Sequence, residues 1–101
     1  MDTLSDAQLI ARVLDGTEPS AFSRLVDRHH SAVYRYACHL VKDWMEAQDL
    51  TQEAFLKAHS QLHTISDPNR FGAWARSILI GLCMNWQRQF RPQFFRLMGE
   101  P

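Results

Sequence analysis

The segment from residue 47 to residue 58 reads AQDLTQEAFLKA, and apolar side chains recur in it every three to four residues. This is the spacing at which side chains share one face of an α-helix. The apolar face consists of Ala47, Leu50, Ala54, Phe55 and Ala58, with Leu62 one turn further on. The opposite face consists of Glu46, Asp49, Gln52, Glu53 and Lys57. The segment is therefore expected to form an amphipathic helix with one buried side and one solvated, charged side.

The ends of this helix are also marked in the sequence. Asp43 and Glu46 have the spacing of a capping box, so the helix should begin directly after Asp43. Residues 64–69 interrupt the apolar pattern, and Asp67 followed by Pro68 is typical of a loop that caps a new helix.

Two helices are expected before this one. Ser5 and Gln8 form a second capping box, with Leu4 and Leu9 at the spacing of a hydrophobic staple, and Gly16 provides a stop. A longer helix should run from about Pro19 to about Lys42. Its apolar positions are Phe22, Leu25, Val26, Val33, Ala37, Leu40 and Val41.

A fourth helix is expected from about Pro68 to about Phe90, because Pro92 should end it. Its inward stripe is predicted to be Phe71, Trp74, Ile78, Leu82 and Trp86. The pattern as a whole predicts an all-α bundle of about four helices. Residues 1–91 would form one domain, and residues 92–101 would begin a linker.

The composition agrees with one soluble domain. The chain has 101 residues, of which 46% are hydrophobic and 22% charged. Its net charge of zero divides unevenly: residues 1–68 carry a net charge of −4, and residues 69–101 carry a net charge of +4. An acidic body with an arginine-containing end suggests two surfaces for two partners, one of them polyanionic. On charge alone, a chance distribution is the favoured interpretation.

Neither a membrane span nor a signal peptide is expected, because no apolar run is long enough and the N-terminus is acidic. Cys38 and Cys83 lie far apart in helical contexts, which favours reduced, buried thiols in a cytoplasmic protein.

Catalytic chemistry has little support in the sequence. There is no glycine-rich phosphate loop, no G-x-S-x-G and no H-E-x-x-H, and no catalytic residue or cofactor is expected. His59 and His63 lie four residues apart and could share a metal, but no third ligand is evident. A small metal-binding helical enzyme therefore stays a minor alternative.

Arginines alternate with aromatic residues toward the C-terminus, where Phe71, Trp74, Trp86 and Phe90 lie among Arg70, Arg76, Arg88 and Arg91. Arginine binds phosphates and stacks on bases, and aromatic rings support unpaired bases, so single-stranded nucleic acid is one candidate ligand. The simpler interpretation is that the aromatic side chains belong to the core.

Three motifs carry a family resemblance. Residues 16–22 with Leu25 resemble a G-[DT]-x-x-A-F-x-x-L pattern shifted by one residue. Residues 47–58 are very similar to A-x-D-L-x-Q-E-x-F-x-x-[AV], and residues 71–88 resemble F-x-x-W-L-x-x-I-A-x-N-x-x-x-D-x-x-R. These are motifs of region 2 of bacterial RNA polymerase sigma factors of the extracytoplasmic-function type (group 4). The resemblance covers about residues 5–91.

The resemblance implies two surfaces. The third helix would dock on the clamp coiled coil of the largest polymerase subunit through Asp49, Gln52, Glu53 and Leu56. The melted minus-ten element of promoter DNA would be held by the loop after the third helix and by the fourth helix. The corresponding residues are Lys57, Gln61, Ile65, Asn69, Arg76, Ser77, Ile78, Gly81, Asn85, Arg88 and Arg91. An anti-sigma factor is implied as a further partner.

The chain departs from the family pattern in the fourth helix, where Gly81 replaces the usual Asn and Asn85 the usual Asp. Gly81 has no side chain that could form a hydrogen bond with a base edge. The alternative function is therefore that of a helical protein-interaction domain, which has kept the sigma-like fold but has lost DNA reading, that is, recognition of the base sequence. Family members also carry a second, helix-turn-helix domain, so we expect this chain to be a fragment or an isolated domain.

Overall fold

The computed structural model describes residues 3–97, the last seven of them by their backbone only. Over this part of the chain the structure has four α-helices, two short 3-10 helices and no strand, which confirms the all-α expectation. The elements are α1 (Asp6–Leu14), α2 (Ala21–Val41), α3 (Trp44–Ser60), η1 (Leu62–Thr64), η2 (Pro68–Arg70) and α4 (Phe71–Leu97).

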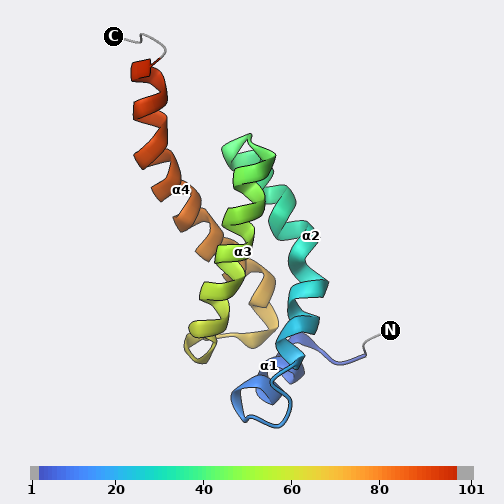
Figure 1. The fold of residues 1–101 in the computed structure, drawn as a ribbon. Helices are drawn as coiled ribbons and strands as arrows, with labels where there is room; N and C mark the ends of the chain where they lie inside the picture. The colour runs from blue at the N-terminus through green and yellow to red at the C-terminus, as the bar shows by residue number, and fades with distance from the viewer. Residues whose placement is uncertain (1–2, 98–101) are drawn as a thin grey trace.

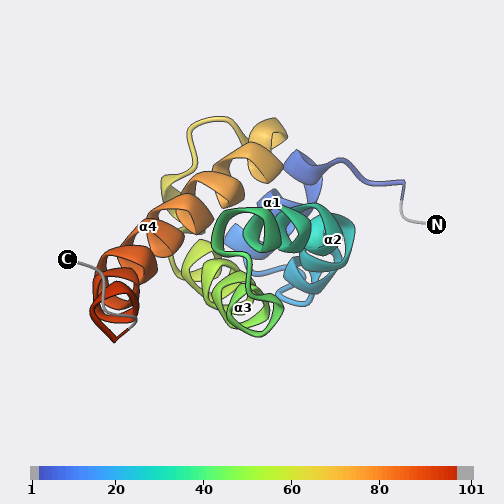
Figure 2. The ribbon, with the colours of Figure 1, turned by 90° about the horizontal axis from the view of Figure 1, so that it is seen from above.

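The helices α2 and α3 form an antiparallel hairpin, and α4 packs against both of them. In Figure 1, α1 lies at the end of the bundle opposite the α2–α3 turn, and Figure 2 shows α2, α3 and α4 around a common centre. The α2–α3 connection is short because Lys42 adopts a left-handed conformation with φ 55° directly after α2. The chain thus reverses direction within two residues.

The predicted helix starts are confirmed where their caps are local in sequence. At α1, the Gln8 backbone N–H donates to Ser5 Oγ (3.1 Å) and the Ser5 N–H donates to Gln8 Oε1 (2.8 Å), a complete capping box. At α3, the Asp43 carboxylate accepts from the N–H groups of Met45 and Glu46. Each cap satisfies donors that the first helical turn leaves without an intrahelical partner.

The core lies where the four helices meet, and the predicted stripe of α3 is confirmed as part of it. Its buried apolar residues are Leu9, Ile10, Ala21, Leu25, Val33, Ala37, Val41, Ala47, Leu50, Ala54, Phe55, Ala58, Leu62, Phe71, Ala75, Leu79 and Cys83.

The predicted inward stripe of α4 is wrong beyond its first member. The buried side chains are Phe71, Ala75, Leu79 and Cys83, whereas Trp74, Ile78, Leu82 and Trp86 are half-buried at the edge of the core. Close approach of helices requires small side chains at the line of contact, and large side chains then cover its flanks. The hydrophobic pattern of α4 therefore identified the side of the helix that faces the core. It placed the most buried line of residues too far to one edge of that side.

The predicted end of the fourth helix is also wrong, because α4 continues through Pro92 to Leu97. Proline removes one backbone donor, but its φ angle is close to that of a helix, so a long helix can continue past it with a local defect. The last turns of α4 extend away from the bundle in Figure 1. The Cα radius of gyration of 15.9 Å accordingly exceeds the ~13 Å of a compact domain of about this length.

Candidate functional site

The outer face of α3 is open to solvent along its length. Asp49, Gln52 and Glu53 are exposed, and Leu56 is 69% exposed, although it is an apolar residue directly after the buried Phe55. A large apolar side chain at such a position is available for contact with a partner.

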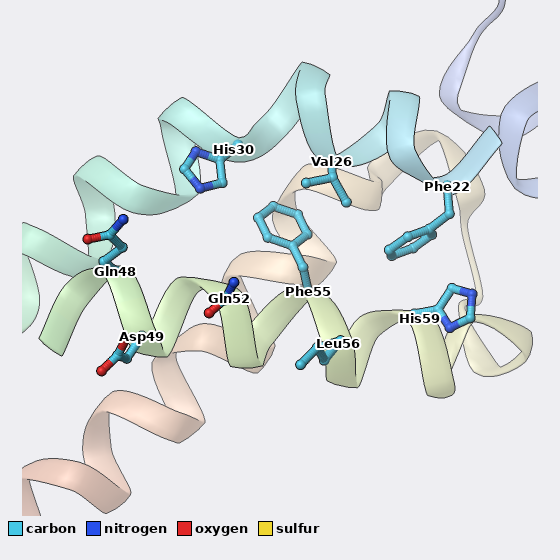
Figure 3. A pocket seen from close by; sticks show the side chains of 9 residues that line it. All are labelled: Phe22, Val26, His30, Gln48, Asp49, Gln52, Phe55, Leu56 and His59. Carbon is cyan, nitrogen blue, oxygen red and sulfur yellow. The ribbon is translucent and has the colours of Figure 1, made fainter. Parts of the chain in front are cut away.

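Part of this face forms one wall of a groove of about 710 Å³ between α2 and α3 (Figure 3). The groove is lined by Phe22, Val26, His30, Gln48, Asp49, Gln52, Phe55, Leu56 and His59. Three of the four predicted α3 residues, all except Glu53, therefore line a single concave surface. Glu53 follows Gln52 and so points about 100° further around the helix.

The α2 wall of the groove was not predicted. Phe22, Val26 and His30 follow one another at intervals of four residues, so they lie on one line along α2. That spacing was the available signal, but Phe22 and Val26 were interpreted as core and His30 was not assigned to this line. In the structure Phe22 and Val26 are only half-buried and His30 is exposed.

Ring contacts hold the groove histidines in place. The ring of His59 meets that of Phe22 edge to face at 4.7 Å, and the ring of His30 stacks on that of Phe55 at 6.1 Å. Among residues 3–90, no group of three or more His, Cys, Asp or Glu side chains is arranged to hold a metal ion. The structure therefore gives His59 a packing contact that the sequence did not indicate.

The predicted nucleic-acid residues before α4 surround the α3–α4 connection. Lys57 and Gln61 are exposed at the end of α3, and Asn69 is exposed in η2. Ile65 is half-buried and packs against the core. Asp67 caps η2 by accepting from the Asn69 N–H at 3.1 Å.

On α4, four predicted residues share one exposed line, which we call the α4 stripe: Ser77, Gly81, Asn85 and Arg88. Half-buried Ile78 lies beside it. A Cβ atom added at Gly81 would meet nothing within 4 Å, so this position is open to solvent.

Arg76 does not belong to the α4 stripe, since at 100° per residue it lies about 120° from Arg88. It lies instead on the flank of α4 that faces α2. On this flank, a Cβ atom at Gly72 would lie 3.0 Å from His29 Nδ1, and Gln87 bonds the backbone of Leu40. The predicted Arg91 side chain lies outside the described residues.

No helix in the described part of the chain is long and apolar enough to cross a membrane.

Comparison with known families identifies the fold. The sigma-70 region 2 family model matches residues 25–91, which include α3, the α3–α4 connection and the α4 stripe. The chain belongs to the sigma-70 region 2 family, and the resemblance to extracytoplasmic-function sigma factors is confirmed by its relatives.

Three relatives illustrate this similarity, and each of them is named an RNA polymerase sigma factor. The chain is 36% identical over 97 residues to the ECF RNA polymerase sigma factor BldN of Streptomyces coelicolor, a match that covers 95% of this chain and 35% of BldN. It is 35% identical over 80 residues to the RNA polymerase sigma-H factor of Pseudomonas aeruginosa, covering 79% of this chain and 41% of that protein. It is 27% identical over 78 residues to the ECF RNA polymerase sigma factor SigX of Bacillus subtilis, covering 77% of this chain and 40% of SigX. The matches thus span well under half the length of these relatives. No solved structure matches the chain.

Proposed function

We propose that this chain serves transcription initiation in the cytoplasm, as the part of an extracytoplasmic-function sigma factor that docks on core RNA polymerase and holds the melted minus-ten promoter element. Membership of the region 2 family and relatives named RNA polymerase sigma factors support this role. The observation that carries the proposal is the exposed outer face of α3, where Leu56 is 69% exposed beside the exposed Asp49 and Gln52.

The proposed polymerase contact is the α2–α3 groove together with Glu53. Apolar side chains such as Val26 and Leu56 suit the apolar side of a partner helix, and Asp49 suits a basic residue beside it. A helix of the clamp coiled coil of the largest polymerase subunit fits this description when it carries arginines.

The proposed nucleic-acid contact consists of the α3–α4 connection and the α4 stripe. Capturing an unpaired base requires an apolar slot with polar edges, and Ile65 and Ile78 are half-buried on either side of the exposed Asn69 and Ser77 in sequence. Arg88 would contact a phosphate, which holds the strand without reading its sequence. Replacing Gly81 by Asn should sharpen the base preference, because the side chain would have room and could bond a base edge.

We also propose an anti-sigma factor as a protein partner. This partner follows from the family resemblance, and co-purification of the chain from its host would identify it.

Charge reversal tests the docking proposal. Asp49→Lys should weaken binding to core RNA polymerase, and Asp49→Lys with Glu53→Lys should abolish it, because both carboxylates are exposed and face the partner. Asp15→Lys, at the far end of α1, is the control and should bind normally. Binding is measured by pull-down and helicity by circular dichroism. Wild-type binding by the folded double variant would refute the docking surface.

A further inference from the structure

The connection between α3 and α4 has little internal support. Its backbone hydrogen bonds are short-range: Thr64 N–H to Gln61 O (2.9 Å), Ile65 N–H to Leu62 O (3.2 Å) and Arg70 N–H to Asp67 O (2.9 Å). Such turns do not fix a loop relative to the rest of the molecule. The loop must therefore be positioned by what packs against it.

The helix α1 packs against both η1 and η2. With nine residues, α1 is too short to be stable alone, so it depends on its attachment to the bundle. Leu9 and Ile10 provide the apolar part of that attachment, with 0% and 1% of their surface exposed.

Asp6 provides the polar part of the attachment. Its carboxylate accepts from Arg28 Nη1 at 2.8 Å through Oδ1 and contacts His29 Nε2 at 2.7 Å through Oδ2. The Asp6 side chain is only 15% exposed and that of His29 only 20%. Charge-assisted contacts with this degree of shielding are stronger than those at an open surface.

His29 in turn lies against the start of α4. Its ring centroid is 5.3 Å from that of Phe71, and a Cβ atom on Gly72 would lie 3.0 Å from its Nδ1. Phe71 follows η2 directly in the chain. The Asp6–His29 pair therefore joins α1, α2 and the first turn of α4 at the point where the α3–α4 connection ends.

We infer that α1 positions the α3–α4 connection for single-strand binding, and that Asp6 and His29 are positioning residues for this binding. The inference rests on the proposed function, since the nucleic-acid contact is part of that proposal. Loss of the pair releases the first turn of α1 from α2, and η1 and η2 then lose part of the surface against which they pack. The DNA strand must then order the α3–α4 connection as it binds, and this ordering lowers the affinity for DNA.

The test compares two carboxylates that each pair with two basic side chains. Asp6 pairs with Arg28 and His29, while Glu18, between α1 and α2, pairs with Arg12 and Arg24. In the full chain, Asp6→Asn should weaken binding of a fluorescein-labelled single-stranded minus-ten oligonucleotide about fivefold, the size of one lost hydrogen bond of ordinary strength. Glu18→Gln should leave this affinity unchanged, and both variants should bind core RNA polymerase normally. Asp6→Glu should recover part of the oligonucleotide affinity.

Two further readouts distinguish positioning from loss of a direct contact. The salt dependence of oligonucleotide binding should stay at the wild-type slope in Asp6→Asn, because no phosphate contact is removed. Backbone amides of Thr64, Ile65 and Arg70 should exchange with deuterium several-fold faster in Asp6→Asn but not in Glu18→Gln. Unchanged exchange in Asp6→Asn would overturn the positioning inference, whether or not the oligonucleotide binds. Faster exchange with no oligonucleotide binding by the wild type would instead support loop positioning and refute the proposed DNA contact.

Discussion

Gln87, on α4, donates a 2.9 Å hydrogen bond from Nε2 to the backbone carbonyl oxygen of Leu40, in the last turn of α2. The last four carbonyl groups of a helix have no intrahelical donor, so a side chain from another helix satisfies this one. The same two helices also meet near Gly72 and His29. They therefore run side by side in the same direction and are fixed at both ends of their contact.

Removing this bond should loosen the end of α4. Gln87→Ala is expected to lower the free energy of unfolding by about 1 kcal/mol, because the half-buried Leu40 carbonyl would lose its side-chain donor. Gln89→Ala, at an exposed position of the same helix, should change it by less than about 0.5 kcal/mol. Urea denaturation measures both, and equal stability of the two variants would show that the bond contributes nothing.

Two adjacent residues of α3 should separate stability from binding. Phe55 is 5% exposed and Leu56 is 69% exposed. Phe55→Ala is expected to cost about 3–5 kcal/mol of unfolding free energy, the range for a buried aromatic residue. Leu56→Ala should cost under about 0.5 kcal/mol but weaken polymerase binding. A loss below about 1 kcal/mol for Phe55→Ala in a denaturant melt would contradict its burial.

The two glycines of α4 should respond differently to replacement by alanine. Gly81→Ala should stabilise the chain by about 1 kcal/mol, since helix propensity rises and the added methyl group meets nothing. Gly72→Ala should gain less or lose stability, because the methyl group would lie 3.0 Å from Nδ1 of His29, which Asp6 holds in place. Thermal unfolding of the two variants in parallel tests this, and a higher melting temperature for Gly72→Ala than for Gly81→Ala would contradict it.

Two arginines of α4 should differ in their effect on oligonucleotide binding. Arg88→Ala, on the α4 stripe, should reduce the slope of log affinity against log salt by about 0.7, the value for one phosphate contact to a single strand. Arg76→Ala should leave the slope unchanged, since Arg76 lies on the flank that faces α2. Fluorescence titrations at several salt concentrations measure the slopes. A slope that falls only in Arg76→Ala would place the strand on the other side of α4.

The two cysteines should react with alkylating reagents at different rates. Cys83 is 2% exposed, and burial raises the pKa of its thiol, which lowers the fraction of reactive thiolate at pH 8. Cys38 is half-buried and should be labelled first. Mass spectrometry after limited iodoacetamide treatment distinguishes the sites, and in concentrated guanidinium chloride the two rates should become similar. Preferential labelling of Cys83 in the native protein would contradict the packing of α4.

The sequence predicted best those features that depend on residues close together in the chain. The caps at Ser5 and Asp43 and the buried stripe of α3 are such features, because their partners lie within a turn or two. The family resemblance added the proposal of a docking face, and three of its residues, Asp49, Gln52 and Leu56, line one groove in the structure.

The features that the sequence did not predict depend on contacts between distant residues. Asp6 and His29 are 23 residues apart, and no local pattern pairs them. The inward line of α4 was misplaced because Ala75 and Cys83 are small, and only the close approach of other helices makes small residues the buried ones. The end of α4 was misplaced because Pro92 was treated as a stop, although a helix can continue past one missing donor.

The parallel contact between α2 and α4 also constrains how many residues α4 can contain between Gly72 and Gln87. One residue inserted there would turn the following part of the helix by about 100° and advance it by about 1.5 Å. Gln87 would then miss the Leu40 carbonyl, and an insertion after Gly81 would also move Arg88 out of line with Ser77 and Gly81. Seven inserted residues would restore the direction of Arg88 to within about 20° but would carry Gln87 about 10 Å past its acceptor. Many substitutions on the exposed faces leave this geometry intact, whereas insertions and deletions do not. The number of residues between Gly72 and Gln87 is therefore more strictly constrained than their identity.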